Sequence, residues 1–467
     1  LYIYFLQPPA RGQTSTVEIY YRGKIEPEAI HNDVVDIGGG PSGQTIRFGN
    51  IRLDTLLYSR SSLWYPSPDD VDYFTARVKF ITPPSLSVLS NGILAEQYAL
   101  ESLEDVEDVG KMGNAVFVYE MARPVKYLAF VVGRLTKRQE ETGTVPLAYY
   151  RGSQTSGDSW DIFSGARAIL DYYQSLFGDF PYEKLAIVRR VWASAGGHSP
   201  ASFVVLNDLP EVILQSMRPN PDSPVDLSKY EDYFLAHEIA HQWWGQGLAW
   251  ETYGDQWLSE GMSQFAAMLF LRQKYGERAF AQILEKFSKT ATKRSEWGSI
   301  TMGSRISYFH YGAYQAIVYN KAALVLNMLR DLMGDEVFFT GVRRFHSRHR
   351  YSAAGTSAFF RTFHDISSRD LAAFFEPWFN SHLLPEARIT HSVESTTGGH
   401  RLRVRVTQSG TPFVFPLWIE WRENGRRVRR KMVVDSRDVS VEFQTGQEPK
   451  KIRFNPEKAV PGRFITK

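Results

Sequence analysis

Residues 233–245 read YFLAHEIAHQWWG, with the pattern His-Glu-x-x-His at the centre. On a helix, residues four positions apart lie on one face, so His237 and His241 point at one spot. Two imidazoles at this spacing can chelate Zn²⁺ without distorting the helix. Glu238, next to the first histidine, can reach a water at the metal rather than the metal itself. The stretch therefore predicts a helix that supplies two ligands and the general base of a catalytic zinc site.

A third ligand must come from another segment, because a catalytic zinc takes three protein ligands and keeps one position open. Residues 257–265 read WLSEGMSQF and begin the next helical pattern, with Glu260 placed 19 positions after His241. A helix, a turn and an antiparallel second helix would bring the Glu260 carboxylate to the metal. Gln264, one helical turn later, could orient a ligand, but we interpret it as a plain helix-face residue.

The alternative for the first helix is a surface helix with two solvated histidines. Several apolar residues make this helix a buried one, namely Phe234, Ala236, Ala240 and Trp244. Buried imidazoles beside a glutamate need partners, and a metal supplies them. The pattern therefore favours a metal site over a solvated helix.

Length and composition narrow the class of protein. A chain of 467 residues suggests two to four domains. Its 43% hydrophobic and 22% charged residues are ordinary for a soluble globular protein. A net charge of +3 is too small to imply a nucleic-acid partner, so the basic run Arg426–Lys431 is interpreted as a solvated hairpin face. Without cysteine, a metal can bind only through His, Asp, Glu or water.

The first third of the chain and the part after Pro385 have the texture of β structure. Expected strands of the first third are Thr16–Tyr21, Tyr73–Phe80, Ala115–Tyr119 and Tyr127–Val132. In the last part, Arg401–Thr407 and Phe415–Glu420 alternate polar and apolar residues, and Asn424-Gly425 predicts a two-residue hairpin turn. We expect a small β-sandwich there.

The middle of the chain has helical patterns with one β-like stretch, Leu185–Val191. The expected helices are Ser159–Leu176, Asp232–Gly245, Trp257–Lys274, Ala313–Met333 and Leu371–Trp378. We therefore predict three domains, at residues 1–147, 148–382 and 383–467. The turn-rich loop Arg218–Asp226 runs up to the helix with the two histidines. No apolar run is long enough to cross a bilayer.

The segments HEIAHQWWG and WLSEG together resemble the gluzincin aminopeptidase family, the family of aminopeptidase N and leukotriene hydrolase. Three further segments are similar to that family: Phe74–Leu94, Tyr127–Leu135 and Pro181–Val188. The resemblance implies a multidomain α+β fold, with an N-terminal β-domain, a thermolysin-like α/β zinc domain and a C-terminal β-sandwich. It also implies a zinc-dependent hydrolase that acts on a peptide or protein substrate.

The resemblance assigns one more catalytic residue. In the family a tyrosine in a Tyr-x-Lys-small-small pattern stabilises the oxyanion, about sixty residues after the glutamate ligand. Tyr319 begins the matching run YNKAA, 59 positions after Glu260. We prefer it to its neighbour Tyr314. The implied mechanism has zinc-activated water attack the carbonyl, Glu238 transfer the proton, and zinc and Tyr319 hold the oxyanion.

The chain departs from the family where the substrate amine should bind. Family members have a Gly-x-Met-Glu-Asn strand whose Glu grips the free α-amine, and the matching residues here are GGHSP, at 196–200. Ser199 replaces the Glu, and Val191–Asn207 contains no carboxylate. We expect Gly196, Gly197, His198 and Ser199 to line the substrate. A second anchor of the family aligns near Leu53 and Thr55, neither of which is acidic or an amide.

Three interpretations follow from this departure. The chain could be an aminopeptidase with another amine anchor, or a zinc endopeptidase or peptidase for blocked or modified peptides. It could also be a non-catalytic binding member, which the retained Glu238 and ligands disfavour. By the same resemblance, the helical C-terminal domain of many members is absent and the front of the N-terminal β-domain is expected to be missing. The chain begins at Leu1 rather than Met, so a leader could have been removed. The sequence therefore does not choose between a cytoplasmic and an exported protein.

Overall fold

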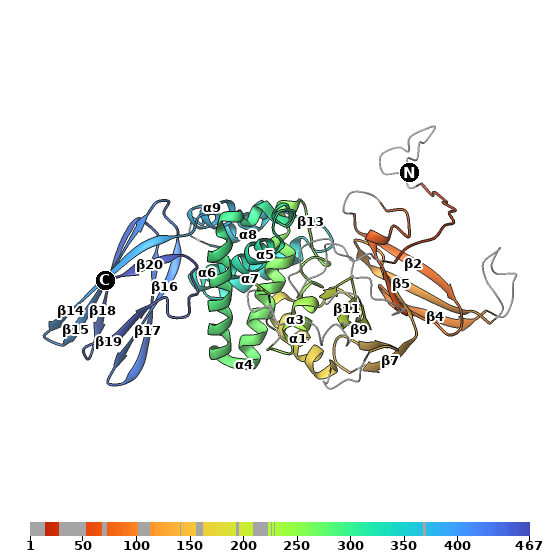
Figure 1. Ribbon diagram of the computed structural model, residues 1–467, viewed down its shortest axis with the longest axis horizontal. Coiled ribbons are helices and arrows are strands. Elements are labelled where there is room, and N and C mark those ends of the chain that lie inside the picture. The colour runs from red at the N-terminus through yellow and green to blue at the C-terminus, as the bar shows by residue number, and fades with distance from the viewer. Residues whose placement is uncertain are drawn as a thin grey trace.

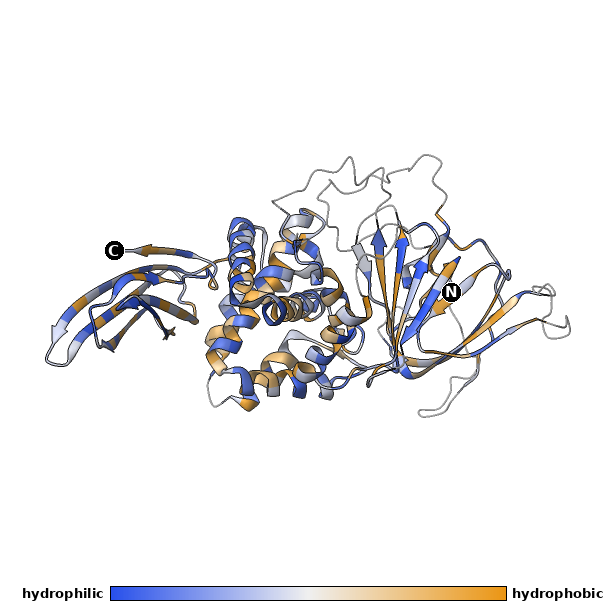
Figure 2. Ribbon diagram, turned by 90° about the horizontal axis from the view of Figure 1, so that it is seen from below, coloured by the Kyte–Doolittle hydropathy of each residue, from blue (hydrophilic) through white to orange (hydrophobic). Residues whose placement is uncertain are grey.

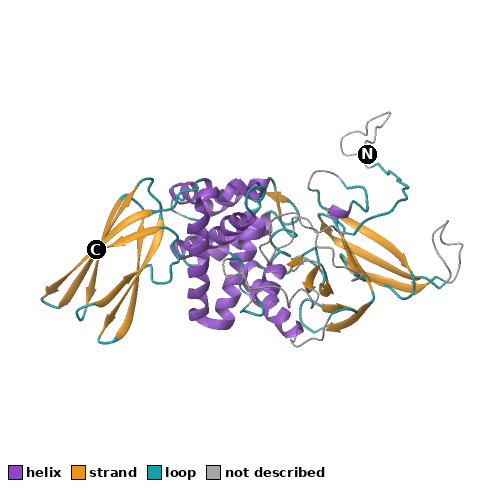
Figure 3. Cartoon of the chain, in the orientation of Figure 1, coloured by secondary structure: helices purple, strands orange, loops and turns teal. Residues whose placement is uncertain are grey.

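The computed structural model describes residues 15–27, 53–67, 72–100, 113–140, 142–155, 162–192, 196–208, 223–225, 227, 229–367 and 370–467. Figure 1 shows an elongated molecule in which a helical body lies between two β-rich parts. Figure 3 shows the helices gathered in this central body. The predicted multidomain α+β fold is confirmed. None of the described helices is long and apolar enough to span a membrane.

The N-terminal β-rich part contains two three-stranded sheets. One has the order β1 (Thr55–Tyr58), β6 (Phe130–Gly133), β3 (Ser87–Ser90), and the other β2 (Phe74–Thr82), β5 (Ala115–Val125), β4 (Ile93–Ala99). The strands predicted at Tyr73–Phe80 and Ala115–Tyr119 are confirmed as β2 and β5. Figure 2 shows both polar and apolar residues along the strands of this part. They alternate along β2, as expected where one face of a sheet is buried, whereas Val116–Tyr119 of β5 are all buried.

Two strand predictions in this part need correction. Thr16–Tyr21 is an exposed segment without strand pairing to any described residue. Its β-branched and aromatic residues favour extended backbone, but a strand also needs a partner edge, which composition does not supply. The strand predicted at Tyr127–Val132 begins only at Phe130, and Ala129 N–H donates instead to the Asn91 side chain.

A five-stranded sheet of order β10-β11-β9-β8-β7 forms one side of the central body. Its strands are β7 (Leu135–Glu140), β8 (Leu147–Gly152), β9 (Leu185–Val191), β10 (Gly196–His198) and β11 (Phe203–Asp208). The strand predicted at Leu185–Val191 is confirmed, and it lies parallel to both neighbours. The short β10 is an antiparallel edge strand. The domain boundaries stay a prediction, and β7, which precedes residue 147, pairs with β8.

Helices form the rest of the central body. They are α1 (Ile162–Phe177), α3 (Tyr233–Ala240), α4 (Trp257–Arg294), α5 (Tyr311–Tyr314), α6 (Ala322–Met333), α7 (Asp335–Arg348), α8 (Thr356–Ile366) and α9 (Ala372–Asn380). Shorter elements complete the central body: η2 (Tyr253–Asp255), η3 (Ser295–Trp297), η4 (Ile300–Ile306), the π-helix η5 (Gln315–Lys321), β12 (Ala249–Trp250) and β13 (Ala353–Ala354). The turn-rich loop Arg218–Asp226 lies mostly outside the described residues.

One helix prediction differs from the structure, and another is confirmed as the first part of a longer element. The helix predicted at Asp232–Gly245 ends at Ala240, because the backbone N–H groups of Gln242 and Trp243 bond to carbonyls three residues back. Gly276, at φ 79°, interrupts α4. Asn320 bonds to both Gln264 and Thr290, which would lie about 39 Å apart on one straight helix. The two limbs of α4 therefore run antiparallel, and the predicted helix 257–274 is the first limb.

The C-terminal part has two facing sheets, of order β18-β15-β14-β20 and β17-β16-β19. The strands are β14 (Glu386–Thr396), β15 (Gly399–Ser409), β16 (Phe415–Glu423), β17 (Arg426–Val434), β18 (Asp438–Thr445), β19 (Lys450–Phe454) and β20 (Arg463–Thr466). Asn424 and Gly425 both have positive φ and join β16 to β17, as a two-residue hairpin requires. In the basic run, Arg427 pairs with Glu420 and Arg429 with Glu457.

Candidate metal centre

Three side chains from two helices meet at one buried point. His237 lies in α3, His241 directly follows its last residue, and Glu260 lies in the first turn of α4. The two Nε2 atoms are 3.1 Å apart, and Glu260 Oε2 lies 3.5 Å from each. Two ligands at about 2.0–2.1 Å from a tetrahedral ion would be about 3.3 Å apart. The three observed separations therefore fit a single zinc ion, and the N, N, O donor set suits it.

The orientation of the His241 ring is set by its other nitrogen. Nδ1 lies 3.0 Å from the carbonyl oxygen of Trp244 and 3.1 Å from the hydroxyls of Ser259 and Ser263. A carbonyl can only accept, so Nδ1 carries the hydrogen and Nε2 turns its lone pair to the centre. Gly245, at φ 117°, makes this possible, because a Cβ there would stand 2.5 Å from Ser259 Oγ.

Charge in this centre is shared between the third ligand and a histidine. Burial lowers the pKa of His241, but the adjacent Glu260 carboxylate outweighs burial and raises it to about 9. Burial raises the pKa of Glu260, and His241 with His237 outweighs that effect and holds it low. Without a metal, His241 thus keeps a proton that pairs it with the Glu260 carboxylate. Metal binding must displace that proton.

Glu238 stands beside the centre, held by the edge strand β10. It is 2% exposed, and its Oε2 accepts a hydrogen bond from the Ser199 hydroxyl. Its Oε1 is buried and has no hydrogen-bond partner in the described structure. At Gly197 a Cβ would lie 2.7 Å from Glu238 Cδ, so only glycine leaves room for this carboxylate. The backbone of β10 therefore packs directly against the candidate general base.

The four residues expected to line the substrate divide between two faces of β10. Gly197 and Ser199 face Glu238, and strand alternation turns Gly196 and His198 to the other face. Thr55, at the second anchor position, is buried away from the centre. Its hydroxyl donates to the Asp54 side chain, and it lies against Gly133 and Gly152. The structure thus places the Gly197 backbone and the Ser199 hydroxyl next to Glu238.

Tyr319 reaches the centre from the π-helix η5. Its ring is nearly parallel to the His237 ring, at 7° and 6.0 Å between centroids, and Tyr314 packs edge-on against it at 5.4 Å. Burial raises the pKa of Tyr319 well above its usual value, so the hydroxyl stays a hydrogen-bond donor. A Cβ at Gly261 would stand 2.6 Å from Ala322 Cβ, so this glycine lets η5 and α6 approach α4 closely.

Gln264 is not the plain helix-face residue predicted from the sequence. It is completely buried, accepts from the Tyr233 hydroxyl at 2.6 Å and donates to Asn320 Oδ1 at 2.8 Å. Its position one turn after Glu260 was the available signal. Sequence reasoning missed its partners, together with Ser259 and Ser263, because their contacts cross between elements.

The fold and this centre together define a metallopeptidase domain of the gluzincin type. Comparison with known families agrees, since residues 165–378 match the Peptidase family M1 domain. The chain therefore contains a peptidase family M1 domain, the domain of the gluzincin aminopeptidases, and the predicted family is confirmed.

Individual relatives are distant. Aminopeptidase 2 of Candida albicans is 22% identical over 416 residues, covering 87% of this chain and 43% of that protein. Endoplasmic reticulum aminopeptidase 2 of Homo sapiens is 31% identical over 123 residues, 26% of this chain and 13% of that protein. A crystal structure of Legionella pneumophila aminopeptidase A with aspartic acid superimposes with a TM-score of 0.67 at 16% identity, covering 88% and 48% of the two chains. The chain spans less than half the length of these relatives.

Proposed function

We propose that this chain is a zinc-dependent metallopeptidase that hydrolyses peptide bonds with a metal-activated water. The observation that carries the proposal is the meeting of His237, His241 and Glu260 at separations that fit one zinc ion, with the carboxylate of Glu238 beside them. The M1 domain match and the aminopeptidase relatives support the same reaction class.

A zinc ion held by the three ligands would lower the pKa of a water beside it and polarise the scissile carbonyl. Glu238 accepts the proton of the attacking water at Oε1, the oxygen that Ser199 leaves free. It then passes this proton to the leaving amine. Tyr319 donates its hydroxyl hydrogen to the carbonyl oxygen as negative charge develops there, and its raised pKa keeps that hydrogen in place.

We further propose that recognition of the substrate amine is altered. The position of the family's amine-binding Glu is Ser199, whose hydroxyl is already bonded to Glu238. A buried ammonium group needs carboxylate partners. The carboxylates that reach this centre from described residues are Glu238 and Glu260, and both have other roles in the proposed mechanism. A peptide without a free α-amine, whether blocked, modified or cut internally, therefore meets no obstacle here.

The test is the cleavage of one peptide in two forms, free and N-acetylated, by the parent protein and by Glu238→Gln. We expect zinc-dependent cleavage of both forms by the parent and almost none by the variant. Cleavage of the free form alone would reject altered amine recognition and leave the metallopeptidase assignment in place. If Glu238→Gln cleaved at the parent rate, the assignment of the general base would be wrong.

A further inference from the structure

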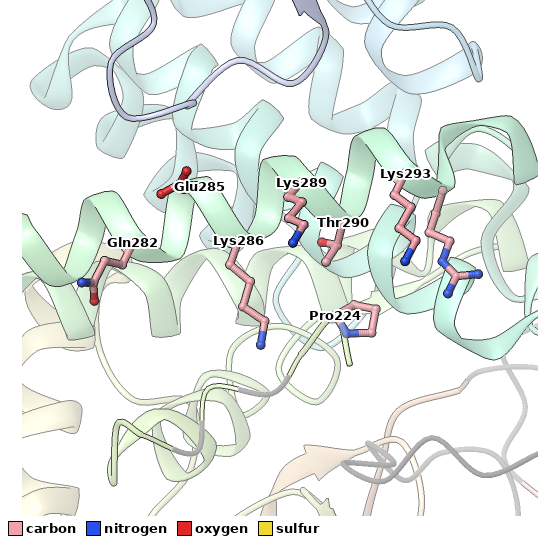
Figure 4. A pocket seen from close by; sticks show the side chains of 8 residues that line it. Pro224, Gln282, Glu285, Lys286, Lys289, Thr290 and Lys293 are labelled. Atoms are coloured by element: carbon pink, nitrogen blue, oxygen red, sulfur yellow. The ribbon is translucent and has the colours of Figure 1, made fainter. Parts of the chain in front are cut away.

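A pocket of about 310 Å³ lies along the second limb of α4, outside the metal centre. Its lining residues are Pro224, Gln282, Glu285, Lys286, Lys289, Thr290, Lys293 and Arg294. Apart from Pro224 they recur every three or four positions along α4, so they form one face of the helix. Figure 4 shows the side chains of Lys286, Lys289 and Lys293 on the side of the helix that faces Pro224.

The lining is strongly cationic, with four basic side chains and one carboxylate. Figure 4 shows the Glu285 carboxylate turned away from the lysines. Lys289 is exposed and makes no ion pair with any carboxylate among the described residues. Arg294 contacts the ring nitrogen of His310, and the guanidinium together with burial lowers the pKa of that imidazole. Lys293 and Arg294 lie in the last turn of α4, where basic side chains also interact favourably with the helix dipole.

One buried side chain links the wall of this pocket to the first limb of α4 and to η5, the elements that carry Glu260 and Tyr319. Asn320 Nδ2 donates to the Pro224 carbonyl at 2.9 Å and to Thr290 Oγ1 at 3.0 Å, and both residues line the pocket. Its Oδ1 accepts from Gln264, one helical turn after Glu260. Asn320 is also the residue after Tyr319. The wall of the pocket is thus a single side chain away from the elements that carry a metal ligand and the candidate oxyanion donor.

We propose that this pocket binds the carboxylate of an acidic side chain in the peptide substrate. The inference rests on the proposed peptidase function for the nature of its ligand. Lysine ammonium groups and an arginine fork are the donors that a carboxylate requires. An extended peptide advances about 3.3 Å per residue, so a peptide held at the metal can place a later residue in a neighbouring pocket. The substrate class is therefore peptides with an acidic group at a distance from the scissile bond.

The test measures binding separately from hydrolysis. Fluorescent peptides that carry Glu or Gln at one position, scanned along the peptide, are titrated into zinc-loaded Glu238→Gln protein, in which they remain intact. The same titration is made with Lys289→Gln and Arg294→Gln added, singly and together. The matched control is Arg278→Gln, an exposed cation on the same limb of α4 that does not line the pocket.

At one or more positions we expect the Glu peptide to bind about five- to tenfold tighter than the Gln peptide, and added salt should reduce this preference. Lys289→Gln with Arg294→Gln should abolish the preference, and Arg278→Gln should keep it. No preference at any position, or a preference that survives the double substitution, would overturn the proposal. A second measurement follows the acylation of the pocket lysines. If inorganic phosphate protects these lysines from acylation and the acidic peptide does not, the pocket is a phosphate site and the proposal is overturned.

Failure of this proposal can be distinguished from failure of the proposed function. If the parent protein fails to cleave any peptide yet the charge preference follows the pocket residues, the peptidase assignment fails and the pocket stands as an acidic-peptide site. If cleavage is zinc-dependent and the preference is absent, the pocket proposal alone is rejected.

Discussion

Substitution of Gly197 by alanine tests the packing of β10 against the candidate general base. The added Cβ would lie 2.7 Å from Glu238 Cδ, 2.8 Å from Glu238 Oε1 and 2.8 Å from Phe234 Cζ. Ordinary contact begins near 3.4 Å, so the carboxylate and the phenyl ring must each yield by several tenths of an ångström. Crowding of this kind in a packed interior costs about 1–3 kcal/mol of stability.

The effect on turnover should exceed the effect on metal binding. The three atoms nearest to the added methyl group belong to Glu238 and Phe234, and none of these three belongs to a metal ligand. Misplacing a catalytic group by about 1 Å can cost on the order of a hundredfold in rate. We expect kcat to fall about 10- to 100-fold, with KM changed less and zinc content near one per chain.

The assay combines peptide cleavage, zinc analysis of the purified protein and thermal unfolding. Gly446→Ala is the matched control, because a Cβ at Gly446 meets nothing within 4 Å and its φ is unremarkable. A Gly197→Ala protein that is folded, holds zinc and turns over at the parent rate would refute the contact between β10 and Glu238 as described. Loss of zinc together with activity would instead place the damage at the ligands.

Three further predictions can be checked with the same protein. Glu238→Gln should keep zinc while kcat drops about 10²- to 10⁴-fold, the usual contribution of a general base; retained turnover with zinc bound would assign that role elsewhere. Glu260→Gln should purify with much less than one zinc per chain by metal analysis, because it removes a ligand and its charge; full occupancy would exclude it as a ligand. Burial lowers the pKa of Lys184 to about 7, while the unfolded chain keeps it near 10.5, so the unfolded state binds more protons between these values and stability should rise with pH across that window. The free energy of unfolding, measured with urea at pH 7 and pH 9, should show this rise in the parent and a smaller rise in Lys184→Met. Equal rises in the two proteins would contradict a lowered pKa of Lys184.

The local sequence pattern alone was sufficient to predict the metal ligands and several secondary-structure elements. His237 and His241 are four positions apart on a helix, and helix geometry brings any such pair to one spot whatever surrounds it. The hairpin at Asn424-Gly425 was equally local, because both residues adopt the positive φ that the turn needs. The strand Leu185–Val191 was visible as a β-like stretch among the helical patterns.

Contacts between distant segments were decided only by the tertiary structure. Thr16–Tyr21 has strand-like residues and no strand partner among the described residues, because pairing depends on an available edge. In the sequence, Gln264 resembles an ordinary helix-face glutamine. In the fold it forms hydrogen bonds with Tyr233 and Asn320, which come from other elements. Ser199 could be read from sequence as the loss of a carboxylate, but its hydrogen bond to Glu238 follows from the position of β10 over α3. Sequence specifies local conformation and the types of chemical group, whereas burial and long-range packing determine which of those groups meet.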